Sequence, residues 1–387
     1  MTCQVQDKTI SDVLELLVAE GFEGMADAMS ILFNEAMRLD RSRHLGAGPW
    51  ERVEARQGYA NGYKPKRVQS RIGSLSLQIP QTRDTDFYPA SLERGIRSER
   101  ALKLALAEMY VQGVSTRKVA KITEQLCGFE ISSTQVSRAT AMLDEQLTAW
   151  RERPLESFPY IVLDARYEKV RHGGRVIDCA VLIALGVDTA GKRQILGCSV
   201  SLSEAEPHWR AFLSSLKDRG LHGIEYFVSD AHEGLKAARK AVFPSVSWQR
   251  CQFHLQQNAQ SYVPHHSMKK TVAADIRSIF NAPDENEAKR LLDHFIERYQ
   301  TTAPKLASWA ESALPEGFSV FDLPDSHRKR MRTSNVLERV NKEIKRRTRV
   351  ATLFPNEASC LRLVTAVVME ISDDWETGRI YLTMDEK

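Results

Sequence analysis

The chain has 387 residues, which is enough for two or three domains with buried cores. Hydrophobic residues make up 42% and charged residues 27%, which is typical of a globular protein and excludes a disordered or membrane-embedded chain. No apolar run has the length of a membrane span, and the N-terminus lacks a signal pattern. Six scattered cysteines without a Cys-x-x-Cys pair argue against a disulfide framework or a four-cysteine zinc site. We therefore expect a cytoplasmic protein with no membrane partner.

The net charge of +4 hides a strong asymmetry. Residues 328–349 contain ten Lys or Arg and two acids, so this segment alone carries +8 and the rest of the chain −4. A positive field concentrated in one segment predicts a phosphate-bearing partner.

Residues 1–95 are predicted to form an N-terminal helical region followed by a basic hairpin. Apolar spacing indicates a helix over residues 9–40. Asn61-Gly62 signals a tight turn, and alternation over residues 68–83 indicates a half-buried strand. Lys64, Lys66 and Arg67 are candidate contacts to the DNA backbone, although a solvated hairpin explains this stretch equally well.

Residues 96–152 are predicted to form a helix-turn-helix-like DNA-binding domain. Ser115 can cap one helix and Ser132 or Ser133 the next, with Cys127-Gly128 ending the first. The connection between them is longer than the usual turn. The start of the second helix supplies three candidate DNA-reading residues, namely Thr134, Gln135 and Arg138.

Residues 153–255 change to a strand pattern. Runs at 160–164, 176–187 and 194–202 are joined by short turns and predict an antiparallel meander. A helix (204–219), a strand (224–229), a helix (234–242) and a strand (246–250) follow. The order βββαβαβ predicts an α/β fold with a ribonuclease-H-like catalytic core.

Residues 256–327 lack strand alternation and predict an all-helical insertion in this core. Residues 328–387 then return to the core. They hold a basic helix over 333–349 and a C-terminal helix over 356–372.

Three carboxylates fall at positions suited to metal chemistry. Asp164 and Asp230 follow apolar strands, and Glu338 lies on the basic helix after the insertion. Mg2+ prefers such oxygen ligands together with substrate phosphate. The alternative for Glu338 is an ordinary surface ion pair with Lys342, four residues on. Other strand and turn aspartates, such as Asp178, are expected to be structural.

These stretches resemble the Mutator-like family of bacterial insertion-sequence DDE transposases, and the resemblance runs over most of the chain. The matching motifs are His44-Leu-Gly-Ala-Gly48, Gly58-Tyr-Ala-Asn-Gly-Tyr-Lys-Pro-Lys66, Val162-Leu-Asp-Ala-Arg-Tyr167, Val228-Ser-Asp-Ala-His-Glu-Gly234, Gln249-Arg-Cys-Gln-Phe-His254 and Thr333-Ser-Asn-Val-Leu-Glu-Arg339. The resemblance implies a DDE triad at Asp164, Asp230 and Glu338, which would be both catalytic and metal-binding.

The resemblance also places the family's Cys/Asp-x-x-His signature on Cys251 and His254. A zinc site is one interpretation of this spacing, with His265 and His266 downstream. The rest of a paired-ligand pattern is missing, so a structural role beside the active site is favoured, with His254 available to DNA phosphate.

The expected function is therefore an insertion-sequence transposase. It would bind terminal inverted repeats as double-stranded DNA, and cleave and transfer strands with two Mg2+ ions, for which Mn2+ can substitute. Joining two element ends implies a homodimer or higher assembly on DNA, nucleoid-associated in the cytoplasm. Candidate phosphate contacts on the basic helix are Arg339, Lys342, Lys345, Arg346 and Arg347. Two alternatives stay open: another ribonuclease-H-like nuclease and a non-catalytic, sequence-specific DNA-binding repressor.

Overall fold

The computed structural model describes residues 2–54, 56–349 and 353–384. The chain divides into two compact units, Met1–Met142 and Leu143–Lys387, and each is described by itself. None of the helices in these described ranges is long and apolar enough to cross a membrane.

The first unit begins with a helical hairpin packed on a β-hairpin. Helices α1 (Thr2–Glu20) and α2 (Met25–Leu45) are separated by the 3-10 turn η1 (Gly21–Gly24), so the region predicted to be helical over residues 9–40 consists of two helices. Strands β1 (Tyr59–Ser70) and β2 (Gly73–Arg83) pair antiparallel. Met37 of α2 packs against the alternate residues of the hairpin that face it, which are Val68, Leu75, Leu77 and Ile79.

The turn of this β-hairpin differs from the prediction. The chain reverses at residues 71–72, where Ser70 pairs with Gly73, while Asn61-Gly62 lies inside β1 at a register irregularity. Gly62 has a φ of 73°, which explains why the local sequence looks like a turn although the strand continues through it.

Three short helices complete the first unit: α3 (Arg100–Val111), α4 (Thr116–Cys127) and α5 (Ser133–Ala141). Ser115 caps α4 by accepting the Lys118 N–H, and Gly128 ends α4 in the left-handed conformation, as predicted. Ser132 caps α5 in a reciprocal capping box with Gln135. Leu102, Leu106, Val119, Ile131, Val136 and Ala139 form the shared core.

The second unit is a mixed α/β structure built on one five-stranded sheet. The strands are β3 (Tyr160–His172), β4 (Arg175–Val187), β5 (Arg193–Ser201), β6 (Tyr226–Ser229) and β7 (Ser247–Arg250), in the order β5-β4-β3-β6-β7. β3, β4 and β5 pair antiparallel, whereas β6 and β7 run parallel to β3. The first strand, predicted to end near Asp164, extends to His172 as one arm of a long hairpin.

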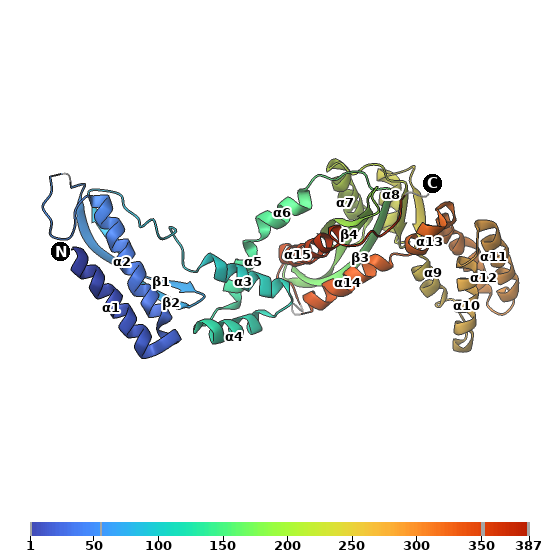
Figure 1. The fold of residues 1–387 in the computed structure, drawn as a ribbon. Helices are drawn as coiled ribbons and strands as arrows, with labels where there is room; N and C mark the ends of the chain where they lie inside the picture. The colour runs from blue at the N-terminus through green and yellow to red at the C-terminus, as the bar shows by residue number, and fades with distance from the viewer. Residues whose placement is uncertain (1, 55, 350–352, 385–387) are drawn as a thin grey trace. The chain divides into compact units, whose positions relative to one another are not determined.

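Helices cover both faces of this sheet (Figure 1). On one face, α7 (Glu206–Asp218) and α8 (Glu233–Val242) bury Trp209, Leu213 and Leu235 against alternate residues of β3 such as Ile161 and Leu163. On the other face lie α14 (Asn335–Thr348) and α15 (Glu357–Glu376), which contact β3 and β5. Helix α6 (Asp144–Glu152), grouped by the sequence prediction with the preceding helices, packs against α15.

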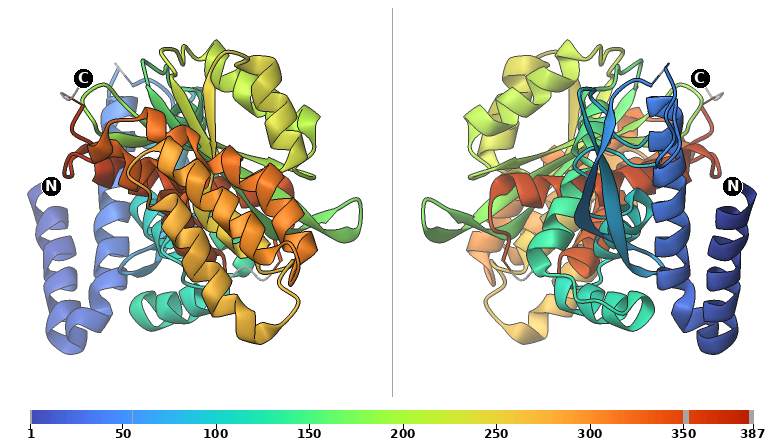
Figure 2. Two further views of the ribbon diagram at one scale, coloured as in Figure 1. Left: turned by 90° about the vertical axis from the view of Figure 1, so that its right-hand side faces the viewer. Right: turned by 90° about the vertical axis from the view of Figure 1, so that its left-hand side faces the viewer.

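The segment between β7 and α14 is helical, as predicted. It contains α9 (Gln252–Ala259), α10 (Lys269–Phe280), α11 (Glu285–Tyr299), α12 (Pro304–Ala313) and α13 (Asp325–Met331), with the 3-10 turns η2 (His266–Met268), η3 (Leu314–Gly317) and η4 (Ser319–Asp322). Leu255, Ile276, Phe295 and Leu306 belong to a separate apolar core. These helices are nearest the viewer in the left view of Figure 2, where the β3–β4 hairpin tip projects to the side.

Candidate active site

Asp164 lies on β3 where the strand loses its parallel neighbour. The pairing of β3 with β6 ends at Val162, whereas its pairing with β4 continues to His172. Because Leu163 faces α7 and α8, the alternation of the strand turns Asp164 toward α14. Its Oδ1 accepts the Ala165 N–H at 2.9 Å, and its Oδ2 accepts from Nδ2 of Asn341 on α14 at 2.8 Å. The helix is thus in direct contact with the first carboxylate.

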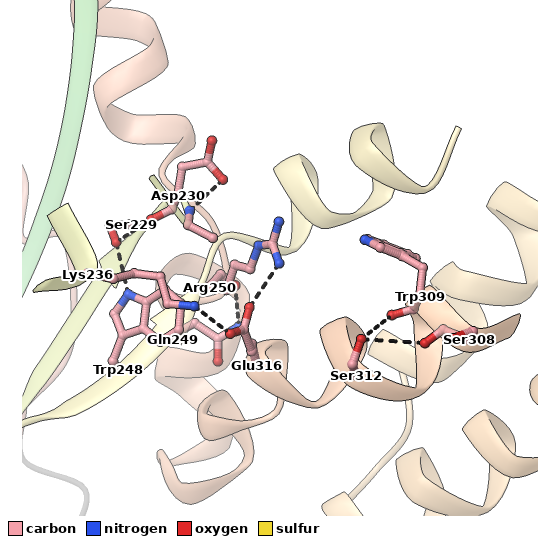
Figure 3. A network of polar contacts seen from close by, with 11 residues as sticks. Ser229, Asp230, Lys236, Trp248, Gln249, Arg250, Ser308, Trp309, Ser312 and Glu316 are labelled. Carbon is pink, nitrogen blue, oxygen red and sulfur yellow. Dashed lines mark hydrogen bonds and ion pairs between the residues drawn. The ribbon is translucent and has the colours of Figure 1, made fainter. Parts of the chain in front are cut away.

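Asp230 follows directly after β6, the strand beside β3. Its Oδ1 accepts the Ala231 N–H at 2.7 Å. The preceding Ser229 hydroxyl donates to the Asp230 carbonyl at 2.8 Å and accepts from Nε1 of Trp248 at 2.9 Å, which holds this turn in place (Figure 3). In the same view the Asp230 carboxylate points away from the ion pairs that Glu316 makes. Asp230 therefore keeps a carboxylate oxygen available.

Glu338 lies in the first turn of α14, where its N–H donates to the Ser334 carbonyl at 3.1 Å. Its Oε1 is buried without a hydrogen-bond partner in the described part of the chain. The ion pair with Lys342 considered from sequence is not among those that the described residues form, whereas Glu343 pairs with Arg347 at 2.8 Å. A buried carboxylate oxygen without a partner is costly, and this distinguishes Glu338 from Glu343, the other acid on this helix.

The charges of the other two carboxylates act on buried Asp164. Burial raises the pKa of Asp164 to about 7 from an ordinary 3.8, with His254 and the Ala165 N–H opposing this and the charges of Glu338 and Asp230 adding to it. Within the described residues, no three His, Cys, Asp or Glu side chains converge closely enough to hold a metal ion. The acids thus share one electrostatic environment without meeting at a point.

Cys251 connects the strand that carries Asp230 to the helix that carries Glu338. Its N–H donates to the Ser229 carbonyl at 2.8 Å, and its fully buried Sγ accepts from the N–H and the hydroxyl of Ser334 at 3.3 and 3.4 Å. Burial raises the pKa of the Cys251 thiol, but His254 and Ser334 outweigh burial, and the net effect lowers it. Cys251 thus joins the end of β6 to the start of α14, and the structural role favoured from the sequence stays a prediction.

His254 brings a positive charge to the acids. Burial lowers its pKa, but Cys251 beside it and the charges of Asp230 and Asp164 outweigh burial and raise the pKa to about 9. Its Nδ1 is buried and has no hydrogen-bond partner in the described ranges. At neutral pH the imidazolium therefore offsets part of the carboxylate charge.

Two residues that the sequence analysis did not single out hold α14 on the sheet. Asn341 donates to Asp164, and its own Oδ1 is buried and unpaired within the described residues. The guanidinium of Arg166 on β3 donates to the Asn341 carbonyl and pairs with Glu168 at 2.7 Å, and Glu168 accepts from Thr348 at 2.9 Å. Asn341 follows Glu338 by three residues and so shares its helix face, which is a signal the sequence contained.

A family model described as "Transposase, Mutator family" matches residues 4–378. The chain belongs to the Mutator family of transposases. Such proteins are enzymes that catalyse DNA transposition, and the resemblance inferred from the sequence motifs is confirmed.

Curated relatives agree with this membership. The transposase for insertion sequence element IS406 of Burkholderia multivorans is 56% identical over the full length of both chains. The transposase for IS256 in transposon Tn4001 of Staphylococcus aureus is 36% identical over 99% of this chain and 98% of its own. Among solved structures, a simian T-cell lymphotropic virus intasome in complex with a PP2A regulatory subunit matches at 11% identity, covering 52% of this chain and 69% of that one. Its TM-score is 0.19, and such a likeness supports no argument about the fold.

The candidate DNA contacts of the N-terminal unit of this transposase differ in availability. Lys64 and Arg67 are exposed on β1, but Lys66 is partly buried and donates to the Tyr88 hydroxyl at 3.1 Å. Thr134 and Arg138 are exposed on α5, whereas the side chain of Gln135 is used in the capping box. Gln135 as a base-reading residue is therefore less well supported than its two neighbours.

The candidate phosphate contacts on the basic helix of the transposase also differ in availability. Arg339, Lys342 and Lys345 are exposed, and Arg346 is exposed but paired with Glu343 at 2.6 Å. Arg347 corrects a prediction: its side chain is 6% exposed and its guanidinium is bound by Glu370 at 2.6 Å and by Glu343. Because both donor edges are occupied by carboxylates, Arg347 stabilises the contact between α14 and α15 and does not reach phosphate.

Proposed function

We propose that this transposase cleaves and joins DNA at a DDE triad formed by Asp164, Asp230 and Glu338, held on a ribonuclease-H-like core. The strands lie in the order β5-β4-β3-β6-β7. β5 is antiparallel to β4 and β4 is antiparallel to β3, whereas β6 and β7 run parallel to β3. This is the arrangement expected of such a core. The observation that carries the proposal is the buried Asp164 carboxylate, whose pKa burial raises and which accepts a 2.8 Å hydrogen bond from Asn341 of α14, the helix that carries Glu338.

The residues at this site fit a divalent cation by their chemistry. Asp164, Asp230 and Glu338 offer hard oxygen donors of the kind Mg2+ or Mn2+ takes, and the unpartnered buried Oε1 of Glu338 marks a position where a positive group is needed. The three carboxylates repel one another, which is consistent with three acids that share a site without converging. Two bound Mg2+ ions would supply activation of the attacking oxygen and stabilisation of the leaving oxygen.

The protein's own groups would position the reactants. Asn341 orients the Asp164 carboxylate through its 2.8 Å hydrogen bond, and Arg166 holds Asn341 in place through its backbone carbonyl. The His254 imidazolium limits the negative charge at the site. Exposed Lys342 and Lys345 lie four and seven residues after Glu338 on α14, so they are placed to bind phosphates of the same DNA strand.

The N-terminal unit would supply sequence recognition. Helices α4 and α5, with capped starts and a shared core, form a compact pair whose exposed Thr134 and Arg138 face solvent at the start and middle of α5. Lys64 and Arg67 on β1 would add phosphate contacts that fix the register. The DNA bound would be the element's terminal inverted repeats, and bringing two ends together requires at least a homodimer.

The test is strand cleavage and transfer on labelled inverted-repeat DNA with Mg2+ or Mn2+. Asp164→Asn, Asp230→Asn and Glu338→Gln should each lower the rate at least about a hundredfold, since a catalytic metal ligand is worth several kcal/mol. Asp178→Asn is the matched control, because Asp178 is an exposed aspartate on β4 in the same sheet. Full activity in any triad variant would refute that residue's role. Specific binding without cleavage by the unaltered protein would favour a repressor.

A further inference from the structure

A second cationic feature lies beside the first turn of α14. A cavity of about 590 Å³ is enclosed by α13, the start of α14, the start of β5 and the segment after α15. Its lining residues are Arg193, Lys329, Arg330, Thr333, Asn335, Val336, Arg339, Arg379, Ile380 and Tyr381. Five of these ten residues are cations, and none is an acid. Of the five, only Arg339 figured among the candidate DNA contacts.

Within the part of the chain that the structure describes, the five cations form no ion pair with a carboxylate. These five are Arg193, Lys329, Arg330, Arg339 and Arg379. Some cations elsewhere in the same unit, such as partly buried Arg250 and buried Arg347, do pair with acids. Like charges gathered without counter-charges repel one another. The rest of the fold therefore has to offset this repulsion to hold the five cations together.

Aromatic rings hold the cavity in shape. The guanidinium of Arg193 lies 4.1 Å from the ring centroid of Trp375 and 5.0 Å from that of Tyr381, and Arg330 lies 4.8 Å from Tyr381. The Tyr381 and Leu382 N–H groups donate to the Gly191 carbonyl at 2.8 and 3.0 Å, which anchors the C-terminal segment to the β4–β5 turn. Tyr381 is thus already in contact with two guanidinium groups, so it pre-organises them and is not free to stack on a base.

The cavity adjoins the position of Glu338. Its lining residues Asn335, Val336 and Arg339 flank Glu338 at the start of α14. Arg193, on another side of the cavity, is paired with Val187, which is paired with Tyr160, four residues before Asp164 on β3. The cavity therefore lies next to the proposed triad, where the backbone of the same DNA strand would continue.

We propose that this cavity binds the phosphodiester backbone of DNA next to the bond held at the carboxylates. Ordinary small-molecule sites are mostly apolar with few polar groups, whereas this lining is dominated by guanidinium groups, whose donor forks match phosphate oxygens. Because the contacts are to backbone, binding here is independent of base sequence. The position along the DNA rests on the proposed triad, but backbone binding itself does not.

The test compares the salt dependence of DNA binding in two double variants of the full chain. Lys329→Gln with Arg379→Gln removes two exposed cavity cations that take part in neither the ring contacts nor any ion pair of the described residues. Lys217→Gln with Lys240→Gln removes two exposed lysines from α7 and α8, on the opposite face of the sheet. Fluorescence anisotropy with a labelled 30-bp duplex in EDTA, over about 50 to 200 mM KCl, gives the slope of log affinity against log salt concentration.

The cavity variant should lower the magnitude of this slope by about 1.8, or about 0.9 for each phosphate that is no longer neutralised, and the control variant should leave it unchanged. An unchanged slope in the cavity variant, or an equal decrease in the control, overturns the proposal. Calorimetry with inorganic pyrophosphate separates the other source of phosphate. If the cavity variant no longer binds pyrophosphate but keeps the wild-type slope on duplex, the cavity takes a free polyphosphate and the proposal is wrong.

Failure of the triad is distinguishable in the same experiment. Asp164→Asn should keep the full salt slope, because EDTA removes metal and the readout is binding alone. A methylphosphonate series in the inverted-repeat end then locates the contact. Neutralising one of the phosphates that neighbour the cleaved bond should weaken binding by the wild-type protein and not by the cavity variant. Equal sensitivity of both proteins at every position would refute the assigned contact.

Discussion

Replacing Asn341 by Ala should impair catalysis far more than folding. The substitution removes the 2.8 Å hydrogen bond from Nδ2 to the Asp164 carboxylate and leaves the Arg166 contact, which uses the Asn341 backbone. Hydrogen bonds to charged groups contribute about 1.5–3 kcal/mol, so the cleavage rate should fall roughly 10- to 150-fold. Loss of a donor to the carboxylate also favours its protonated form, so the rise of activity with pH should shift to higher pH by about one unit.

Thr348→Ala is the matched control for this variant. Thr348 lies on the same helix and also donates to a carboxylate of β3, that of Glu168 at 2.9 Å, but away from Asp164. If Asn341 acts by orienting Asp164, only Asn341→Ala changes the pH profile and the Mg2+ concentration at half-maximal cleavage on labelled inverted-repeat DNA. If Thr348→Ala reduces cleavage as much, or if Asn341→Ala cleaves like the wild type from pH 6 to 9, the orienting role is refuted.

Three further outcomes follow from burial and pairing. The raised pKa of Asp164, about 7 against 3.8, means that its contribution to stability is fully present below pH 3.8 and is lost as pH rises through 7. In EDTA, the free energy of unfolding should therefore fall by about 2–4 kcal/mol from pH 5 to 8. Asp164→Asn should remove that loss. Mg2+ should raise the Tm more at pH 8 than at pH 5. Gln249→Leu should cost about 1–3 kcal/mol in urea unfolding, because the buried Val320 N–H loses its 2.8 Å acceptor; an unchanged midpoint would contradict this. Arg347→Gln should lower the free energy of unfolding by about 1–3 kcal/mol, because it breaks the hydrogen bonds of Arg347 with Glu370. The salt slope of DNA binding should stay unchanged. A reduced slope would restore Arg347 as a phosphate contact.

The sequence predicted the sheet well where hydrophobic alternation was strong. The buried runs of β4 and β5, and the two short parallel strands, were placed within a few residues of their observed bounds. The far half of β3 was not predicted, because Arg166 and Glu168 interrupt its apolar pattern. In the structure these side chains pair with each other and contact α14, so their polarity reflects a partner helix and not a strand end.

Individual roles on α14 were harder to predict than the helix itself. Charge and spacing identified Glu338 among cations, but they could not separate exposed Lys345 from buried Arg347, because the deciding partner Glu370 belongs to another helix. Asn341 was missed for a related reason. Its hydrogen bond to Asp164 joins residues 177 positions apart, and an amide carries no charge to mark it.

The helical insertion separates Asp230 from Glu338 in sequence, and yet the chain segments next to these two residues are joined where the insertion leaves the sheet and returns to it. Cys251, where the insertion begins, binds Ser229 on one side and Ser334 on the other, although Cys251 and Ser334 are 83 residues apart. Gln249 adds a second connection by donating to the Gly317 carbonyl at 2.9 Å. Loop-closure entropy rises by only about 0.6 kcal/mol for each doubling of loop length, so a long insertion closed in this way costs little stability. Within the Gln249–His254 motif, Cys251 and Gln249 therefore fix the place where the chain returns to the core before Glu338. This anchoring does not depend on how the helices of the insertion pack.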